Sequence, residues 1–317
     1  MPNIEEEQGF ELPTGFPEIE FPEDNAYSLE RWELGKKLFY DKTLSIDSSI
    51  SCGSCHKASL AFSDDVPLSD GVKGRPGTRN APTLANVAYH PYYTREGGVP
   101  TLEMQVLVPI QEHNEFAFNI VQAGERMATN LEYIQMSQEA YGRVPNYYVI
   151  TRALANFERS LISGNSPYDH FTHLKDFSAL NDMEKAGMDL FYSNKTNCSN
   201  CHGGFNFTDY TFQNNGLYKT YSDLGRMRLT SKEKDKALFK TPTLRNIGVT
   251  SPYMHDGSIG TLKEVIEHYN SGGNSHHHQS ELIRPLGLTE TEKQELLAFL
   301  NSLTDSQFIT NKRFKEK

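Results

Sequence analysis

The four cysteines are the feature of this 317-residue sequence that most constrains its fold. Every cysteine belongs to a CxxCH motif, the first formed by Cys52, Cys55 and His56 and the second by Cys198, Cys201 and His202. Two thiols one helical turn apart can bond the two vinyl groups of a haem, and the histidine that follows can bind its iron. Two disulfides or a four-thiolate zinc site are the alternatives, but a CxxC disulfide closes only a short loop and the zinc site leaves both histidines unused. The sequence therefore predicts two covalently attached c-type haems.

The sequence around the first motif is repeated around the second. Residues 35–40, before the first CxxCH, resemble residues 187–192, before the second. Further along, residues 81–86 match residues 241–246 at an offset of 160 residues. A likeness that persists along the chain is the mark of an internal duplication. The chain is therefore predicted to contain two copies of one haem-binding unit.

A Gly/Ser/Pro cluster at residues 163–167 is typical of a linker between two such copies. We predict an N-terminal haem c domain over residues 1–164 and a C-terminal haem c domain over residues 165–317. Long connections at 63–100 and 203–260 are expected to be loops, and loops of that length in a compact domain are usually functional. We expect them to pack on haem.

Apolar residues at helical spacing, such as Ile150, Leu154 and Phe157, predict a mainly α-helical chain. The stretches 261–269 and 289–303 each open with a capping box, a threonine followed three residues later by a glutamate. Few stretches show the alternation typical of strands. The predicted architecture is two cytochrome c-like haem domains related by internal duplication.

Charge and hydrophobicity exclude several classes of function. The chain has 31 basic and 41 acidic residues, a net charge of −10, and its basic residues are scattered, which argues against nucleic acid as a partner. A basic protein partner stays open, although a solvated surface explains the charge more simply. No run of about 18 apolar residues is present, and the acidic N-terminus lacks the apolar stretch of a signal peptide. Because c-type haem is attached outside the bacterial cytoplasm, we expect a periplasmic protein whose export signal has been removed. A homodimer is compatible with the sequence.

The repeat also compares the positions that face the two irons. Pro109 of the first copy aligns with Tyr269 of the second. Proline cannot bind iron, so the first iron is expected to stay open, whereas a tyrosine can bind the second as a phenolate. From the repeat alone, a packing role for Tyr269 remains the alternative. Met254, His255 and His268 are rival ligands, although Met254 and His268 fall outside the position that aligns with Pro109.

The motifs LGKKLFYDKTLS, SCGSCHKASLAFSD, RNAPTLANVAY, NCSNCHGGFNFTD and TLKEVIEHYNSGG resemble those of the bacterial di-haem cytochrome c peroxidase family, and within it the MauG-like branch. The likeness extends from about Leu34 to Thr304. It implies an α-helical two-domain fold with a peroxide-reacting haem in the N-terminal copy and an electron-transfer haem in the C-terminal copy. By the same resemblance, Gln105 and Glu115 line the distal pocket of the open haem.

The resemblance also implies a calcium ion between the domains. Its ligands would be Asn80 and the main-chain carbonyl groups of Thr250 and Pro252. Oxygen ligands of this kind suit calcium. A lone asparagine is more often a turn or capping residue, which is the alternative for Asn80.

The sequence departs from the family pattern at three positions. Val72 replaces a distal histidine, so no reductive opening of the first haem should be needed. Tyr269 replaces a methionine on the second haem, as in the MauG-like branch, which strengthens its assignment as a ligand. Arg95 stands where the family has a tryptophan thought to bridge the haems. An aromatic relay must then use Tyr92 or Tyr93, or electrons must pass without one.

Two enzymatic functions follow from the resemblance. In the first, the protein reduces hydrogen peroxide at the N-terminal haem with electrons from a small cytochrome c or cupredoxin, delivered through the C-terminal haem. In the second, peroxide provides the oxidising power to modify tyrosine or tryptophan of a partner protein, as the MauG-like branch implies. A simple electron carrier is disfavoured because it gains nothing from an open site opposite Pro109. We favour peroxide reduction.

Two further assignments depend on side-chain chemistry. Glu115 is expected to move a proton between the two peroxide oxygens while Gln105 orients the peroxide, although a solvated surface carboxylate is the commoner fate of a glutamate. Residues 276–278 are three consecutive histidines. They can be read as metal ligands, but the Ser-Gly-Gly before them favours an exposed loop.

Overall fold

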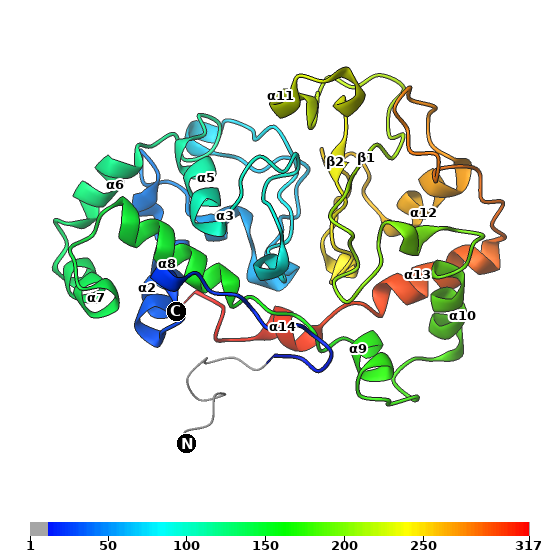
Figure 1. The fold of residues 1–317 in the computed structure, drawn as a ribbon, viewed down its shortest axis with the longest axis horizontal. Helices are drawn as coiled ribbons and strands as arrows, with labels where there is room; N and C mark the ends of the chain where they lie inside the picture. The colour runs from blue at the N-terminus through cyan, green and yellow to red at the C-terminus, as the bar shows by residue number, and fades with distance from the viewer. Residues whose placement is uncertain (1–11, 317) are drawn as a thin grey trace.

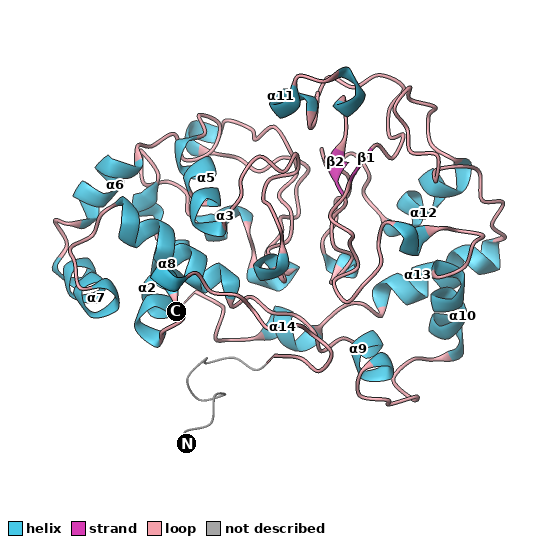
Figure 2. Cartoon of the chain, viewed as in Figure 1, coloured by secondary structure: helices cyan, strands magenta, loops and turns pink. Residues whose placement is uncertain are grey.

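The computed structural model describes residues 12–316, which form two lobes side by side (Figure 1). Helices dominate both lobes. Strand structure in the described residues is one antiparallel pair, β1 (Phe212–Gln213) with β2 (Phe239–Lys240), shown in Figure 2. The prediction of a mainly helical chain is confirmed. Within residues 12–316, no helix is both long and apolar enough to cross a membrane.

The helices divide between the lobes in chain order. The first lobe contains α2 (Leu29–Tyr40), α3 (Cys52–Cys55), α4 (Leu102–Gln105), α5 (Leu107–Gln111), α6 (Ile120–Met127), α7 (Leu131–Tyr141) and α8 (Tyr147–Arg159). The second contains α9 (Pro167–Thr172), α10 (Asp182–Phe191), α11 (Met227–Thr230), α12 (Leu262–Ser271) and α13 (Glu290–Asn301). A last helix, α14 (Ser306–Thr310), lies where the two lobes meet, and the chain after it runs back to the first lobe (Figure 1).

Helix capping explains where α12 and α13 begin. Thr261 accepts a hydrogen bond from the backbone N–H of Glu264, whose carboxylate accepts one from the backbone N–H of Thr261. Thr289 and Glu292 form the same reciprocal pair at the start of α13. Each box satisfies two backbone N–H groups that have no partner inside the helix. Both predicted capping boxes are confirmed.

Two glycines show the duplication in three dimensions. In the first lobe α2 packs on α8, and in the second α10 packs on α13. A Cβ atom at Gly35 would lie 1.9 Å from the carbonyl oxygen of Ala153, and one at Gly187 would lie 1.9 Å from that of Glu295. Only glycine permits so close a backbone contact. The repeated Gly is thus a packing requirement of both helix pairs.

The cores of the lobes repeat as well. Each contains a triangle of buried phenylalanines, formed by Phe39, Phe62 and Phe157 in the first lobe and by Phe191, Phe207 and Phe299 in the second. The ring centroids of Phe39 and Phe157 are 5.1 Å apart, as are those of Phe191 and Phe299. These tilted and edge-on contacts are the arrangement that aromatic rings prefer. The same three-ring core therefore supports each CxxCH motif.

The end of the chain belongs to the core of the first lobe. Phe308 and Phe314 are buried there, and Phe308 packs against Phe62 with centroids 5.8 Å apart. The hydroxyl of Tyr40 donates a hydrogen bond to the carbonyl oxygen of Phe314 over 2.6 Å. The first core is therefore assembled from both ends of the sequence.

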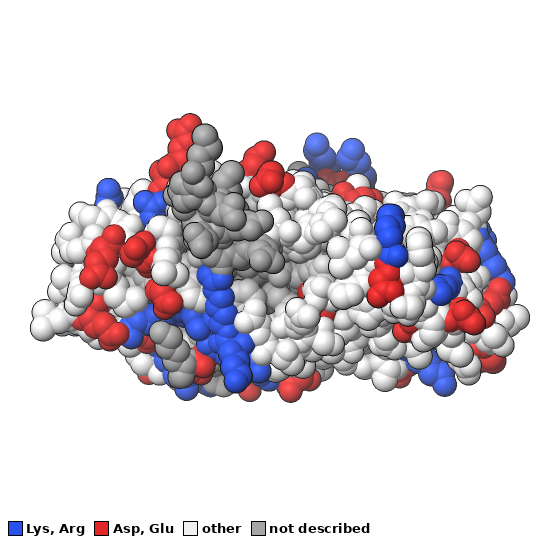
Figure 3. All heavy atoms as spheres, turned by 90° about the horizontal axis from the view of Figure 1, so that it is seen from below, with Lys and Arg blue, Asp and Glu red and all other residues white. Residues whose placement is uncertain are grey.

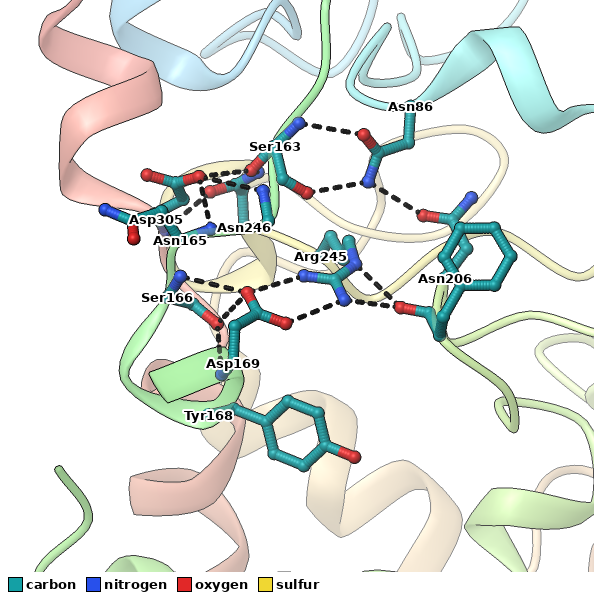
Figure 4. A network of polar contacts seen from close by, with 12 residues as sticks. Asn86, Ser163, Asn165, Ser166, Tyr168, Asp169, Asn206, Arg245, Asn246 and Asp305 are labelled. Atoms are coloured by element: carbon teal, nitrogen blue, oxygen red, sulfur yellow. Dashed lines mark hydrogen bonds and ion pairs between the residues drawn. The ribbon is translucent and has the colours of Figure 1, made fainter. Parts of the chain in front are cut away.

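Residues 163–167 connect the lobes through a buried polar network rather than as an exposed strand of chain (Figure 4). Asn86 and Ser163 exchange two 2.8 Å hydrogen bonds. Asn246, the counterpart of Asn86 in the repeat, donates to the hydroxyl of Ser163 and accepts from the backbone N–H of Asp305. Each copy thus uses its repeated asparagine to hold the chain where it passes between the lobes.

The ion pair of Arg245 with Asp169 is the most buried in this network. The guanidinium donates two 2.9 Å hydrogen bonds to the carboxylate, and its Nε donates to the carbonyl oxygen of Phe205. The side chains of Arg245 and Asp169 are 1% and 3% exposed. Burial alone would raise the pKa of Asp169, but the hydrogen bonds and charge of Arg245 outweigh it and lower that pKa.

Arg245→Ala is expected to lower the free energy of unfolding by about 3–5 kcal/mol, because it leaves the Asp169 carboxylate buried without its partner. Urea denaturation of the haem-loaded protein measures this. Lys195→Ala is the control, since it removes the exposed pair with Glu292 and is expected to cost at most about 1 kcal/mol. Equal losses in the two variants would contradict the structural role of the buried pair.

Candidate functional site

The first CxxCH motif forms a single helical turn, α3. Ser51 and Ser54 form a capping box at its start, and the N–H of His56 donates to the carbonyl oxygen of Cys52 at its end. Both cysteine thiols are free, and burial raises the pKa of Cys55 to about 11. The Nδ1 atom of His56 lies 2.8 Å from the carbonyl oxygen of Phe62. This contact orients the ring and leaves Nε2 available to a metal, the usual arrangement of a histidine ligand.

The second motif has the same local geometry on a 3-10 turn over Cys198–Asn200. The N–H of His202 donates to the carbonyl oxygen of Cys198, and its Nδ1 lies 3.2 Å from the carbonyl oxygen of Phe207. Burial lowers the pKa of His202, as it does that of His56, so both rings are neutral, the form that binds iron. In residues 12–316, no three His, Cys, Asp or Glu side chains gather to hold a metal ion. Paired free thiols, each with an oriented imidazole, therefore fit two covalently attached c-type haems.

The predicted pocket residues of the first copy meet beside the first motif. Val72 is fully buried, and its N–H donates to the carbonyl oxygen of Glu115 over 2.9 Å. The N–H of Phe116, the next residue, donates to the carbonyl oxygen of Pro109. Gln105 ends α4 one turn before Pro109, and its buried Oε1 has no hydrogen-bond partner within the described part of the chain. Val72 and Pro109 thus both contact the segment that carries Glu115, and Gln105 lies one helical turn before Pro109.

Glu115 has the electrostatics of an acid–base group. Burial and, as a smaller cause, the negative charge of Glu112 together raise the pKa of its carboxyl to about 7. The charge of Glu115 in turn raises the pKa values of Cys52 and Cys55, which places the carboxyl near the first motif. A group with this pKa can both accept and return a proton near neutral pH. The solvated-surface alternative for Glu115 is not what the structure shows.

Tyr269 lies on α12 near the second motif. Burial raises the pKa of its phenol to about 12, while a hydrogen bond from the Asn215 side chain opposes that rise. The charges of Cys198 and Cys201 also raise the pKa of the phenol, which places it near the second motif. The phenol therefore stays protonated at neutral pH unless a metal cation binds its oxygen.

The three rival ligands have other contacts. The Sδ atom of Met254 accepts a hydrogen bond from Nδ2 of Asn215 over 3.1 Å. The Nε2 atom of His268 lies 3.0 Å from the carbonyl oxygen of Asn215. The ring of His255 stacks on Phe239 with centroids 4.2 Å apart. Asn215 thus contacts Tyr269, Met254 and His268 alike, and the assignment of Tyr269 as the ligand stays a prediction.

The aromatic residues between the lobes form a contact chain. The hydroxyl of Tyr92 donates a hydrogen bond to the carbonyl oxygen of Tyr210 in the other lobe, and its ring stacks on Phe212. The ring of His90 lies 6.2 Å from that of Tyr93 and 5.2 Å from that of Tyr210. Tyr92 thus contacts the second lobe directly, whereas Tyr93 is connected to it through the ring of His90.

The remaining predicted residues lie on loops. Asn80 donates its backbone N–H to the carbonyl oxygen of His255, so it faces the loop that carries Thr250 and Pro252. Residues 276–278 lie in a turn between α12 and α13, where His276 contacts Asn214 and the ring of His277 is exposed.

Sequence reasoning missed two residues beside the haem motifs. Glu158 on α8 is a buried carboxyl whose pKa burial raises to about 8, and its charge acts on Cys52. A signal was available, because Glu158 comes four residues after Leu154 on the apolar face of that helix. Asn215, which contacts both Tyr269 and Met254, lies in a long loop without periodicity and gives no such signal.

Comparison with known proteins gives a consistent result. The sequence profile described as Di-haem cytochrome c peroxidase matches residues 29–176. The chain is 35% identical to the methylamine utilization protein MauG of Methylorubrum extorquens over 298 residues, 93% of this chain and 83% of that protein. It is 34% identical to the cytochrome c551 peroxidase of Nitrosomonas europaea over 280 residues, 87% of this chain and 80% of that protein.

A solved structure agrees with this comparison. The crystal structure of a MauG-like protein associated with microbial copper homeostasis matches with a TM-score of 0.92 and 33% sequence identity. The match covers 96% of this chain and 98% of that protein. The repeated lobes, the two CxxCH motifs and these similarities show that the chain belongs to the di-haem cytochrome c peroxidase family, oxidoreductases that act on peroxide.

Proposed function

We propose that the protein reduces hydrogen peroxide at the first CxxCH site with electrons delivered through the second. The observation that carries the proposal is the partly buried Glu115 carboxyl, which lies near the first motif with a pKa of about 7. Val72 and Pro109, which lie against the same segment, offer no side chain that can bind iron. In this proposal residues 1–164 hold the peroxide-reacting haem and residues 165–317 the electron-transfer haem.

Cys52, Cys55 and His56 would hold a haem, which would supply a redox-active iron for the reaction with peroxide. Glu115 takes the proton from one peroxide oxygen and gives it to the other, so that the departing oxygen leaves as water. Gln105 orients the peroxide with its side-chain amide, whose Oε1 has no partner among the described residues.

A second function is favoured by one residue, Tyr269. A phenolate stabilises ferric iron and makes the second haem a poor acceptor for electrons from ordinary cytochromes. Such a protein would instead use the oxidising power of peroxide on a tyrosine or tryptophan of a partner protein. The relatives divide in the same way, since their names include both MauG and cytochrome c551 peroxidase.

The first test is the reaction of the fully oxidised protein with peroxide. Because neither Val72 nor Pro109 can bind iron, we expect stopped-flow spectra to change at once, without prior reduction. The spectrum before mixing should show one high-spin haem. Two low-spin haems, with reactivity only after partial reduction, would contradict an open first site.

The second test separates the two functions. We expect rapid turnover of peroxide with a reduced small cytochrome c or cupredoxin in the periplasm, where we place the protein. For the alternative, proteins from the same compartment are incubated with the enzyme and peroxide. Mass spectrometry then detects any modified tyrosine or tryptophan. Modified tyrosine or tryptophan on one partner, together with slow oxidation of every donor, would overturn the proposal in favour of protein oxidation.

A further inference from the structure

Arg95 lies at the seam between the lobes, beside the residue implied as a calcium ligand. Its Nη2 atom donates a hydrogen bond to the main-chain oxygen of Asn80 over 2.7 Å and lies 3.4 Å from the side-chain Oδ1. Its own carbonyl oxygen accepts from the backbone N–H of Lys240 in the other lobe over 2.7 Å. Arg95 therefore joins the two lobes at the position where the resemblance predicts the metal.

The side chain of Asn80 does not face a metal site. Its Nδ2 lies 3.3 Å from the carbonyl oxygens of both Val66 and Pro67, which turns Oδ1 toward the Arg95 guanidinium. The other implied ligands, from Thr250 and Pro252, are neutral carbonyl groups. No acidic cluster that could hold a metal occurs in residues 12–316. The implied donor set is therefore neutral, so it contributes no negative charge to offset a calcium ion placed beside the guanidinium.

The surrounding charge also disfavours a second cation. Arg95 makes no ion pair of its own in the described part of the chain, so its charge is not neutralised by direct contact. The nearby acids have other partners: Glu96 and Asp223 pair with Arg79, and Asp256 accepts from the hydroxyl of Tyr218.

A second basic residue adds to this field. Burial, with the charge of Arg95 as a smaller cause, lowers the pKa of Lys240 to about 8. A divalent ion on Asn80 would stand next to the guanidinium, whose charge already acts on this ammonium group. Its repulsion from the guanidinium would be stronger than in bulk water because Arg95 is partly shielded from solvent.

We propose that the Arg95 guanidinium supplies the positive charge between the lobes that calcium would otherwise supply, and that this site binds no calcium. The guanidinium holds Asn80 within the first lobe, and the contact between the lobes here is made by the main chain, through the N–H groups of Lys240 and Asn80. Neither contact depends on the concentration of a metal ion. A planar group with several N–H donors suits the main-chain and amide oxygens of Asn80.

The test uses the haem-loaded protein, purified with calcium present and then freed of unbound ions. We expect inductively coupled plasma mass spectrometry to find no bound calcium. Neither calcium nor the chelator EGTA should shift its melting temperature or its haem spectrum. One bound calcium ion per chain, with a fall in melting temperature when EGTA removes it, would overturn the proposal.

Arg95→Ala and Arg95→Gln test whether the guanidinium is what excludes the metal. Each variant should bind calcium at least about tenfold more tightly than the natural protein, which isothermal titration calorimetry measures. Added calcium should also raise the melting temperature of each variant by about 4 °C or more. Arg143→Ala, which removes an exposed arginine remote from the seam, should gain neither. If a variant that retains both haems binds calcium no better than the natural protein, Arg95 is not what excludes the metal. If neither variant retains its haems, the calcium content of the natural protein decides alone.

Discussion

Glu115→Gln is expected to slow the reaction of the oxidised protein with peroxide by about 10²–10⁴-fold, the range of a positioned acid–base group. The substitution keeps the size of the side chain and removes its ability to accept a proton. Both haems should stay attached, because Glu115 is neither a thiol nor an iron ligand. Stopped-flow spectra of the variant at several peroxide concentrations measure the second-order rate constant.

The pH dependence of the rate of reaction with peroxide is a second test of Glu115. Burial and the charge of Glu112 raise the pKa of Glu115 to about 7, and only the deprotonated carboxylate can accept the proton of peroxide. The rate should therefore rise as the pH increases through about 7 and level off above it. In Glu115→Gln this step should vanish.

Glu112→Gln provides the matched control. Glu112 is exposed, three residues before Glu115, and its charge contributes to the raised pKa. This variant should keep the full rate at high pH and move the step in the profile to lower pH. An unchanged rate in Glu115→Gln would make Glu115 a packing residue and remove the main support for the proposed function.

The repeated parts of this fold could be read from the sequence. Gly35 and Gly187 recur, as the CxxCH motifs do, because each copy packs a pair of helices so closely that only glycine fits at their contact. Such constraints act within one lobe and leave a visible pattern. The predicted capping boxes and the mainly helical fold were confirmed for the same reason.

The seam between the lobes could not be read in this way. The bonds of the Lys240 N–H to the carbonyl oxygen of Arg95 and of the Asn246 amide to the Ser163 hydroxyl join residues in loops that are far apart in the chain. No periodicity marks such a pair, since its geometry appears only when both lobes are packed. The cluster at 163–167 has the composition of an exposed linker. Ser163 is nevertheless buried, and its backbone N–H donates a hydrogen bond to the side chain of Asn86.

The largest expected change in redox behaviour comes from Tyr269→Met. A phenolate stabilises ferric iron, whereas a methionine thioether favours ferrous iron, so the potential of the second haem should rise. The expected rise is on the order of hundreds of millivolts, because axial ligands set haem potentials over about 0.8 V. Spectroelectrochemical titration of the haem-loaded protein measures it, and the first haem serves as an internal reference.

Two control variants test whether the change in potential comes from the loss of an iron ligand. Tyr253 is a buried tyrosine in the same lobe, and its hydroxyl donates a hydrogen bond to the carbonyl oxygen of Ile247. Tyr253→Phe removes this hydroxyl and should leave the potential of the second haem unchanged. Met254→Leu removes the nearby sulfur, which Asn215 already holds by a hydrogen bond, and should change it little. If Met254→Leu moves the potential and the low-spin spectrum while Tyr269→Met alters neither, the sulfur binds the iron. The second haem would then carry an ordinary electron-transfer ligand, and the case for oxidation of a partner protein would fall with Tyr269.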